Sequence, residues 1–209
     1  MHLLLSLLFS VHVQAAPVVT ETVGQVADYV ATSRELQIST VIERVVFPGK
    51  ISSLEISPEQ PEFRNALTAL LLEIVVAMEA ESFSVASVSE KDIEAGIAKV
   101  QRAVAGKAYW NQLEVSEAEL KKFTTRKFVA KNFLKFKTNS MAGIVTDQEA
   151  EAYYEKNRLK FGNMPFASFK ENIKTFLAQQ QLEERLRNWF EVIKRKYKVR
   201  NFMADRQGT

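Results

Sequence analysis

The chain contains no cysteine, and its 209 residues include only seven glycines and five prolines. Without cysteine no disulfide scaffold can form, so the fold must be held together by packing alone. So few turn-forming residues also argue against a β-rich fold, which needs frequent turns between short strands. Both features favour a mainly helical domain with a sizeable apolar core.

Histidine is confined to the start of the chain, where His2 and His12 are its only two copies. The remaining residues therefore cannot supply a Ser-His-Asp or Cys-His catalytic mechanism, nor an imidazole or thiolate ligand for zinc. The sequence also lacks a glycine-rich phosphate loop, the spacing of an EF-hand and a nucleophile elbow. We expect no catalytic residue, no metal site and no cofactor, and hence a protein that binds rather than reacts.

An apolar run covers residues 3–13 and is too short to span a bilayer. Val13-Gln14-Ala15 follows it, with residues of the size that a signal peptidase accepts, although Met1-His2 before the run has no Lys or Arg. We expect residues 1–15 to be a signal peptide and residues 16–209 to form one exported domain.

Local patterns divide this domain into short strands at its ends and helices between them. β-branched residues predict strands over residues 18–26 and 29–31. Capping motifs and apolar residues three and four positions apart predict the helices, and an apolar tail is expected to pair with the first strand. The expected helices cover residues 32–47, 58 or 61 onward, 89–105, 110–113, 116–137, 146 onward and 166–197, and the tail covers 199–203.

The long closing helix carries two apolar stripes that differ by roughly 130° around its axis. The first stripe includes Phe169 and Ile173, the second includes Trp189 and Ile193, and the change falls at residues 179–181. Three arrangements fit this pattern: a bend, one helix crossing two parts of a single core, or packing on a second copy of the chain.

Residues 121–137 are rich in cations and phenylalanine and contain no acidic residue. One interpretation is a solvated basic face with its phenylalanines turned to the core; another is a surface that recruits acidic clients or anionic membrane headgroups. Nucleic acid is excluded as a partner because we expect an exported protein. The candidate basic face is Lys121, Lys122, Arg126, Lys127, Lys131, Lys135 and Lys137, and the candidate client-binding aromatics are Tyr109, Trp110, Phe123, Phe128 and Phe136.

Residues 144–162, IVTDQEAEAYYEKNRLKFG, resemble the signature V-T-[DE]-x-E-x-x-x-Y-Y-x-x-N-x-x-x-F of the SurA/PrsA-type periplasmic and extracytoplasmic chaperones. Residues 18–47 are similar to the opening of that family, and residues 85–98 to its V-x-[IV]-S-[DE]-x-[DE]-[IV] helix start. Residues 166–202 resemble its closing helix and strand. These stretches occur in the family's order and cover nearly the whole mature chain.

Many members of this family insert parvulin prolyl isomerase domains between the signature helix and the closing helix. Here only Asn163-Met164 separates Gly162 from Pro165, so the resemblance implies a chaperone module without isomerase activity. It further implies ATP-independent binding of unfolded, aromatic-rich segments of outer-membrane or other exported proteins in the periplasm. The alternatives are an exported adaptor that docks on one folded partner and a prolyl isomerase with an unrecognised site; a homodimer is a secondary hypothesis.

Overall fold

The computed structural model describes residues 20–49, 53–83 and 87–205. The predicted signal peptide, residues 1–15, and the beginning of the strand predicted over 18–26 lie outside these ranges. The described chain is mainly helical, as predicted. Its elements are β1 (Thr22–Val26), β2 (Tyr29–Thr32), α1 (Ser33–Val46), α2 (Glu62–Phe83), α3 (Glu90–Val104), α4 (Ala108–Gln112), α5 (Glu117–Met141), α6 (Asp147–Lys156), the 3₁₀ turns η1 (Arg158–Lys160) and η2 (Phe166–Ser168), α7 (Lys170–Lys196), β3 (Arg200–Asn201) and α8 (Phe202–Asp205).

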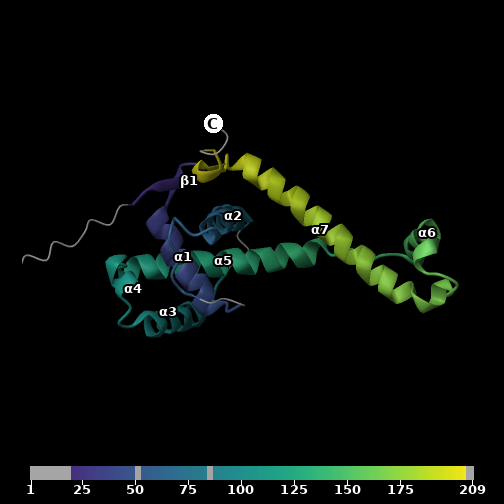
Figure 1. The fold of residues 1–209 in the computed structure, drawn as a ribbon, viewed down its shortest axis with the longest axis horizontal. Helices are drawn as coiled ribbons and strands as arrows, with labels where there is room; N and C mark the ends of the chain where they lie inside the picture. Colours follow the sequence, from purple (N-terminus) through teal and green to yellow (C-terminus); the bar gives the residue numbers. More distant parts are fainter. Residues whose placement is uncertain (1–19, 50–52, 84–86, 206–209) are drawn as a thin grey trace, which may run out of the picture.

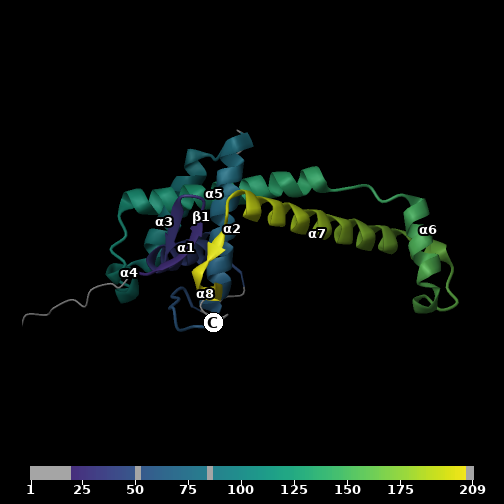
Figure 2. The same cartoon turned by 90° about the horizontal axis from the view of Figure 1, so that it is seen from above.

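Two long helices, α5 and α7, connect a larger body to a small distal lobe (Figure 1). The body contains the strands, α1 to α4, α8 and the adjoining halves of α5 and α7 (Figure 2). The distal lobe contains α6, η1, η2 and the first half of α7. With 25 residues in α5 and 27 in α7, each helix is roughly 40 Å long, which carries the lobe clear of the body.

The strands form an antiparallel sheet in the order β2-β1-β3, which joins the two ends of the domain. Gly24 pairs with Asn201 and Gln25 with Arg200, so the predicted pairing of the first strand with the tail is confirmed. A Cβ atom at Gly24 would lie 2.8 Å from Leu71 Cδ2 and 3.0 Å from the Arg200 carbonyl oxygen. Glycine is therefore required where the sheet packs directly on α2.

The central element of the body is α2. It contacts α1, α5, α7 and the sheet. Phe63, Leu67 and Val75 are fully buried in the main core cluster. A second cluster joins α1 and α3 to α4 and α5. Burial of each large apolar side chain in these clusters contributes about 1.5–3 kcal/mol to the stability of the folded state.

The two stripes of α7 contact two separate clusters. Ile173 is buried in the distal lobe with Ala150 and Tyr154, whereas Ile193 is buried in the main core of the body. One helix therefore crosses two distinct packed units. In the lobe, the predicted capping box is confirmed, because Thr146 and Glu149 exchange side-chain and backbone hydrogen bonds at the start of α6.

The prediction of a strand over residues 199–203 is wrong for its second half. Only Arg200–Asn201 form β3, and Phe202–Asp205 form the short helix α8. The Asn201 side-chain oxygen accepts hydrogen bonds from the backbone N–H groups of Met203 and Ala204, both at 3.1 Å. This local bonding offers the backbone an alternative to the sheet and ends the strand. The closing helix also begins later than predicted, since its first turn, η2, is a separate 3₁₀ turn.

Within the described ranges, none of the helices combines the length and the hydropathy that crossing a membrane requires.

Candidate functional site

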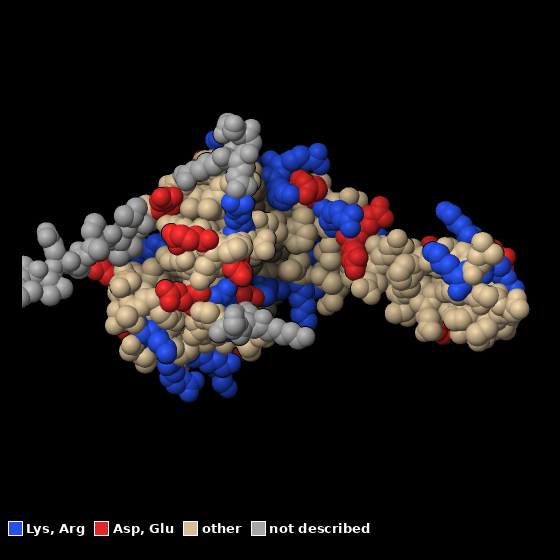
Figure 3. All heavy atoms as spheres, in the orientation of Figure 1, with Lys and Arg blue, Asp and Glu red and all other residues tan. Residues whose placement is uncertain are grey.

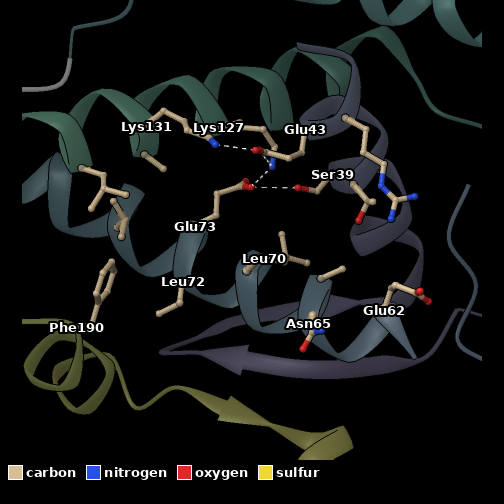
Figure 4. Close-up of a pocket in the computed structure, with 17 residues that line it drawn as sticks. Ser39, Glu43, Glu62, Asn65, Leu70, Leu72, Glu73, Lys127, Lys131 and Phe190 are labelled. Carbon is tan, nitrogen blue, oxygen red and sulfur yellow. Dashed lines mark hydrogen bonds and ion pairs between the residues drawn. The ribbon is translucent and has the colours of Figure 1, made fainter. Parts of the chain in front are cut away.

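An open groove lies in the body between α1, α2, α5 and the C-terminal half of α7 (Figure 4). Its volume is about 520 Å³, within the range of about 300–1000 Å³ typical of binding sites. Its lining on α2 extends from Glu62 to Val76, which is about 21 Å at 1.5 Å per residue. The surface of the groove is mainly apolar, and eight of its 17 lining residues are apolar: Ala66, Ala69, Leu70, Leu72, Val76, Ala130, Leu134 and Phe190.

One wall of the groove is formed by charged side chains that neutralise each other. Lys127 Nζ lies 2.5 Å from Glu73 and 3.3 Å from Glu43, and Lys131 Nζ lies 2.7 Å from Glu43. The Ser39 hydroxyl donates to Glu73 at 3.1 Å (Figure 4). Because these charges are paired within the protein, the wall offers little net attraction to a charged ligand.

The wall continues into a buried network behind it. Arg126 donates to Glu73 at 2.7 Å and to Glu35 at 2.6 Å, and these three side chains are at most 12% exposed. Burial alone would raise the pKa of Glu73, but the charges of Lys127 and Arg126 outweigh it and lower that pKa. Burial, followed by the negative charge of Glu35, raises the pKa of Tyr29 to about 12. The network therefore stays ionised at Glu73 and protonated at Tyr29 near neutral pH.

A row of aromatic rings leads out of the groove at the end formed by α7. Phe190 in the groove packs on Trp189 with ring centroids 4.9 Å apart, and Trp189 lies 6.2 Å from Phe133. Phe133 in turn contacts Phe83 and Phe136, which are 51% and 45% exposed. A series of ring contacts thus links Phe190 in the groove to the exposed rings of Phe83 and Phe136.

Four of the five candidate client-binding aromatics are wholly or partly buried. Tyr109 and Trp110 are half-buried against the second core cluster, and Phe123 is buried within it. Phe128 packs against Phe47 in an edge-to-face arrangement, with the ring centroids 5.2 Å apart. Only Phe136 is exposed, and none of the five lines the groove.

The candidate basic residues do not form one exposed face. Arg126 and Lys127 point inward and belong to the buried network. Lys121 pairs with Glu90, Lys131 lines the groove, and the remaining three are distributed around α5. Lys122 lies over the Tyr29 ring, Lys135 is exposed, and Lys137 lies over Phe83 and Trp189.

The groove was not predicted from the sequence, because the apolar residues of α2 were all expected to lie in the core. Leu72 and Val76 widen the apolar stripe of α2, and both line the groove, although Val76 also belongs to the main core. The width of this stripe was the signal in the sequence that could have indicated the groove. Phe190 follows Trp189 in the second apolar stripe of α7, and its position at the groove depends on where α7 crosses α2 and α5.

No protein-family model, curated protein or solved structure matches this chain in comparisons with known proteins. Among the described residues, no group of three or more Asp, Glu, His or Cys side chains is placed to hold a metal ion.

Proposed function

We propose that this protein is an ATP-independent holdase chaperone of the periplasm, which binds unfolded, aromatic-rich segments of exported or outer-membrane proteins. The observation that carries this proposal is the open groove along α2, with its apolar floor and its internally neutralised wall. Such a surface favours apolar side chains without selecting for a particular charge. Phe83 and Phe136 would extend the contact area beyond the groove.

The dimensions of the groove suit an extended polypeptide. At about 3.3 Å per residue, its 21 Å length along α2 accommodates about six residues of extended chain. The 520 Å³ volume would take a few large side chains from such a segment. The resemblance of residues 144–162 to the SurA/PrsA-type signature and the expected export of the chain support the same function.

The test is suppression of aggregation of several unfolded outer-membrane proteins, with and without a blocked groove. Ala69 is exposed on α2 and lines the groove, so Ala69→Glu places a charge on the apolar floor without disturbing the core. Ala98→Glu, at an exposed position of α3, is the matched control. We expect wild type and Ala98→Glu to delay aggregation of several clients, and Ala69→Glu to delay it several-fold less.

Equal activity of the two variants would reject the groove as the client site. Failure of the wild-type protein to protect any unfolded client would reject the holdase function. Capture of one folded envelope protein in that case would favour the adaptor function instead.

A further inference from the structure

The end of the distal lobe combines exposed apolar side chains with unpaired cations. Leu159 is 100% exposed at the centre of η1, and Met164 is 52% exposed five residues later. Residues 156–170 include four cations and no acidic residue, although Glu155 and Glu171 flank the segment. We define the lobe tip as residues 156–164. It lies at the end of the molecule farthest from the body (Figures 1 and 2).

The cations of the tip have no ion-pair partner in the part of the chain that the structure describes. None of the described carboxylates forms an ion pair with Lys156, Arg158 or Lys160, whereas Lys170 at the base of the lobe pairs with Asp147. Arg158 lies over the Tyr154 ring, 4.6 Å from its centroid. On the face drawn in Figure 3, Lys and Arg side chains project from the outer part of the lobe.

The tip is held in shape by the core of the lobe. The Tyr154 hydroxyl donates to the Met164 carbonyl at 2.5 Å, and the Lys160 N–H donates to the Asn157 carbonyl at 2.8 Å. The Phe161 ring packs on the Tyr154 ring, with centroids 5.0 Å apart. Leu159 is therefore presented by a preorganised turn, so contact with a partner costs little ordering entropy.

We infer that the lobe tip docks on the surface of an anionic lipid bilayer, with Leu159 entering the headgroup boundary and Lys156, Arg158 and Lys160 contacting the headgroups. A fully exposed leucine on a projecting turn has no surrounding wall to enclose a polypeptide, but it can enter a bilayer. Burial of the leucine side chain and attraction of the nearby cations to the anionic surface both favour this contact. The body, with its groove, would then stand away from the membrane at the other end of α7.

The absence of cysteine allows a local readout of this contact in the full chain. Leu159→Cys provides one thiol for a bimane dye, and Val192→Cys, at a 53% exposed position near the C-terminal end of α7, is the matched control. With vesicles of one part phosphatidylglycerol to two parts phosphatidylcholine, we expect a blue shift and increased bimane emission at position 159 only. Vesicles of phosphatidylcholine alone should give a much smaller change.

The charges are tested with the same labelled protein. Lys156→Gln with Lys160→Gln removes two cations from the tip, and Lys91→Gln with Lys99→Gln removes two exposed cations from α3. We expect the first pair to weaken the position-159 response about tenfold or more, and the second pair less than about twofold. Added salt should weaken the wild-type response.

Absence of a response at position 159, an equal response at position 192, or equal effects of the two lysine pairs would overturn the inference. A response to unfolded client but not to anionic vesicles would also overturn it, and would assign the tip to client binding. These outcomes are independent of the aggregation assay, because neither vesicles nor tip variants involve the groove.

Discussion

Lys127 Nζ lies 2.5 Å from Glu73 Oε2 in the wall of the groove, and the two side chains are only 6% and 8% exposed. This pair joins α5 to α2 and is continuous with the Arg126–Glu35 pair behind it. A buried ion pair adds little net stability compared with an apolar pair, but removal of one partner leaves a charge without compensation. The wall is therefore sensitive to single substitutions.

Lys127→Met should lower the free energy of unfolding by about 3 kcal/mol, because Glu73 keeps only Arg126 and Ser39 as partners. The measurement is urea denaturation monitored by circular dichroism. Lys121→Met is the control, because Lys121 forms an exposed pair with Glu90 and its loss should leave the midpoint almost unchanged. Equal effects of the two substitutions would show that the buried pair has no special role.

The stability should also depend on pH through Glu119. Its hydrogen bond with Arg34, aided by the Ser116 cap, lowers the pKa of Glu119 to about 2. Because the pKa of Glu119 is lower in the folded protein than in the unfolded chain, where it is about 4.3, ionised Glu119 stabilises the fold at any pH above about 4.3. This stabilisation is lost as the pH falls from about 4.3 toward about 2. Glu73, whose pKa is also lowered, acts in the same direction.

Glu119→Gln should therefore reduce the urea midpoint at pH 7, and the difference from wild type should shrink as the pH is lowered below about 4.3 and be mostly lost by pH 2. The comparison requires denaturation curves of both proteins at several pH values across this window. A difference that stays constant down to pH 2 would mean that the Arg34–Glu119 pair contributes through shape and not through charge.

The order of the helices and the two packed faces of α7 could be predicted because both depend on local signals. Thr146 and Glu149 form the capping box that their spacing indicates. The two faces of α7 were visible as two stripes, and Ile173 and Ile193 occupy the two clusters that the stripes imply. In each case the pattern lies within one helix, so no knowledge of distant contacts was needed.

The site could not be predicted in the same way, because it depends on partners distant in sequence. Arg126 and Lys127 look like members of a solvated basic face until α2 brings Glu73, more than fifty positions away, beside them. Phe123 and Phe136 each follow a lysine in the same basic segment, yet Phe123 is buried and Phe136 is exposed. Only the packing of α5 on α1, α2 and α7 separates these cases.

The contact between the sheet and α2 should not tolerate a side chain at Gly24. Gly24→Ala would press a methyl group against Leu71 and the Arg200 carbonyl, and should lower the free energy of unfolding by about 1–3 kcal/mol. Gly49→Ala is the control, because no atom lies within 4 Å of the added Cβ. Thermal unfolding of the two variants checks this expectation, and a Gly24→Ala protein as stable as Gly49→Ala would contradict the observed closeness of β1 to α2.

The distal lobe should unfold locally without loss of the body. Ile173 and Ile193 are both buried on α7, at 4% and 1% exposure, but in the separate clusters of lobe and body. Each substitution by alanine should cost about 2–5 kcal/mol. Because the lobe core is small, the cost of Ile173→Ala should exceed the free energy of unfolding of the lobe alone. Amide-exchange protection in α6 should then be abolished, while protection in α2 persists.

Ile193→Ala should instead lower protection throughout the body, since its cluster contains α2 and the sheet. Hydrogen exchange followed by mass spectrometry resolves the two helices as separate peptides. Loss of α2 protection in Ile173→Ala, or full α6 protection in that variant, would show that lobe and body are one cooperative unit. Local unfolding would also remove the preorganised tip, so Ile173→Ala should bind anionic vesicles more weakly and still protect clients through the groove.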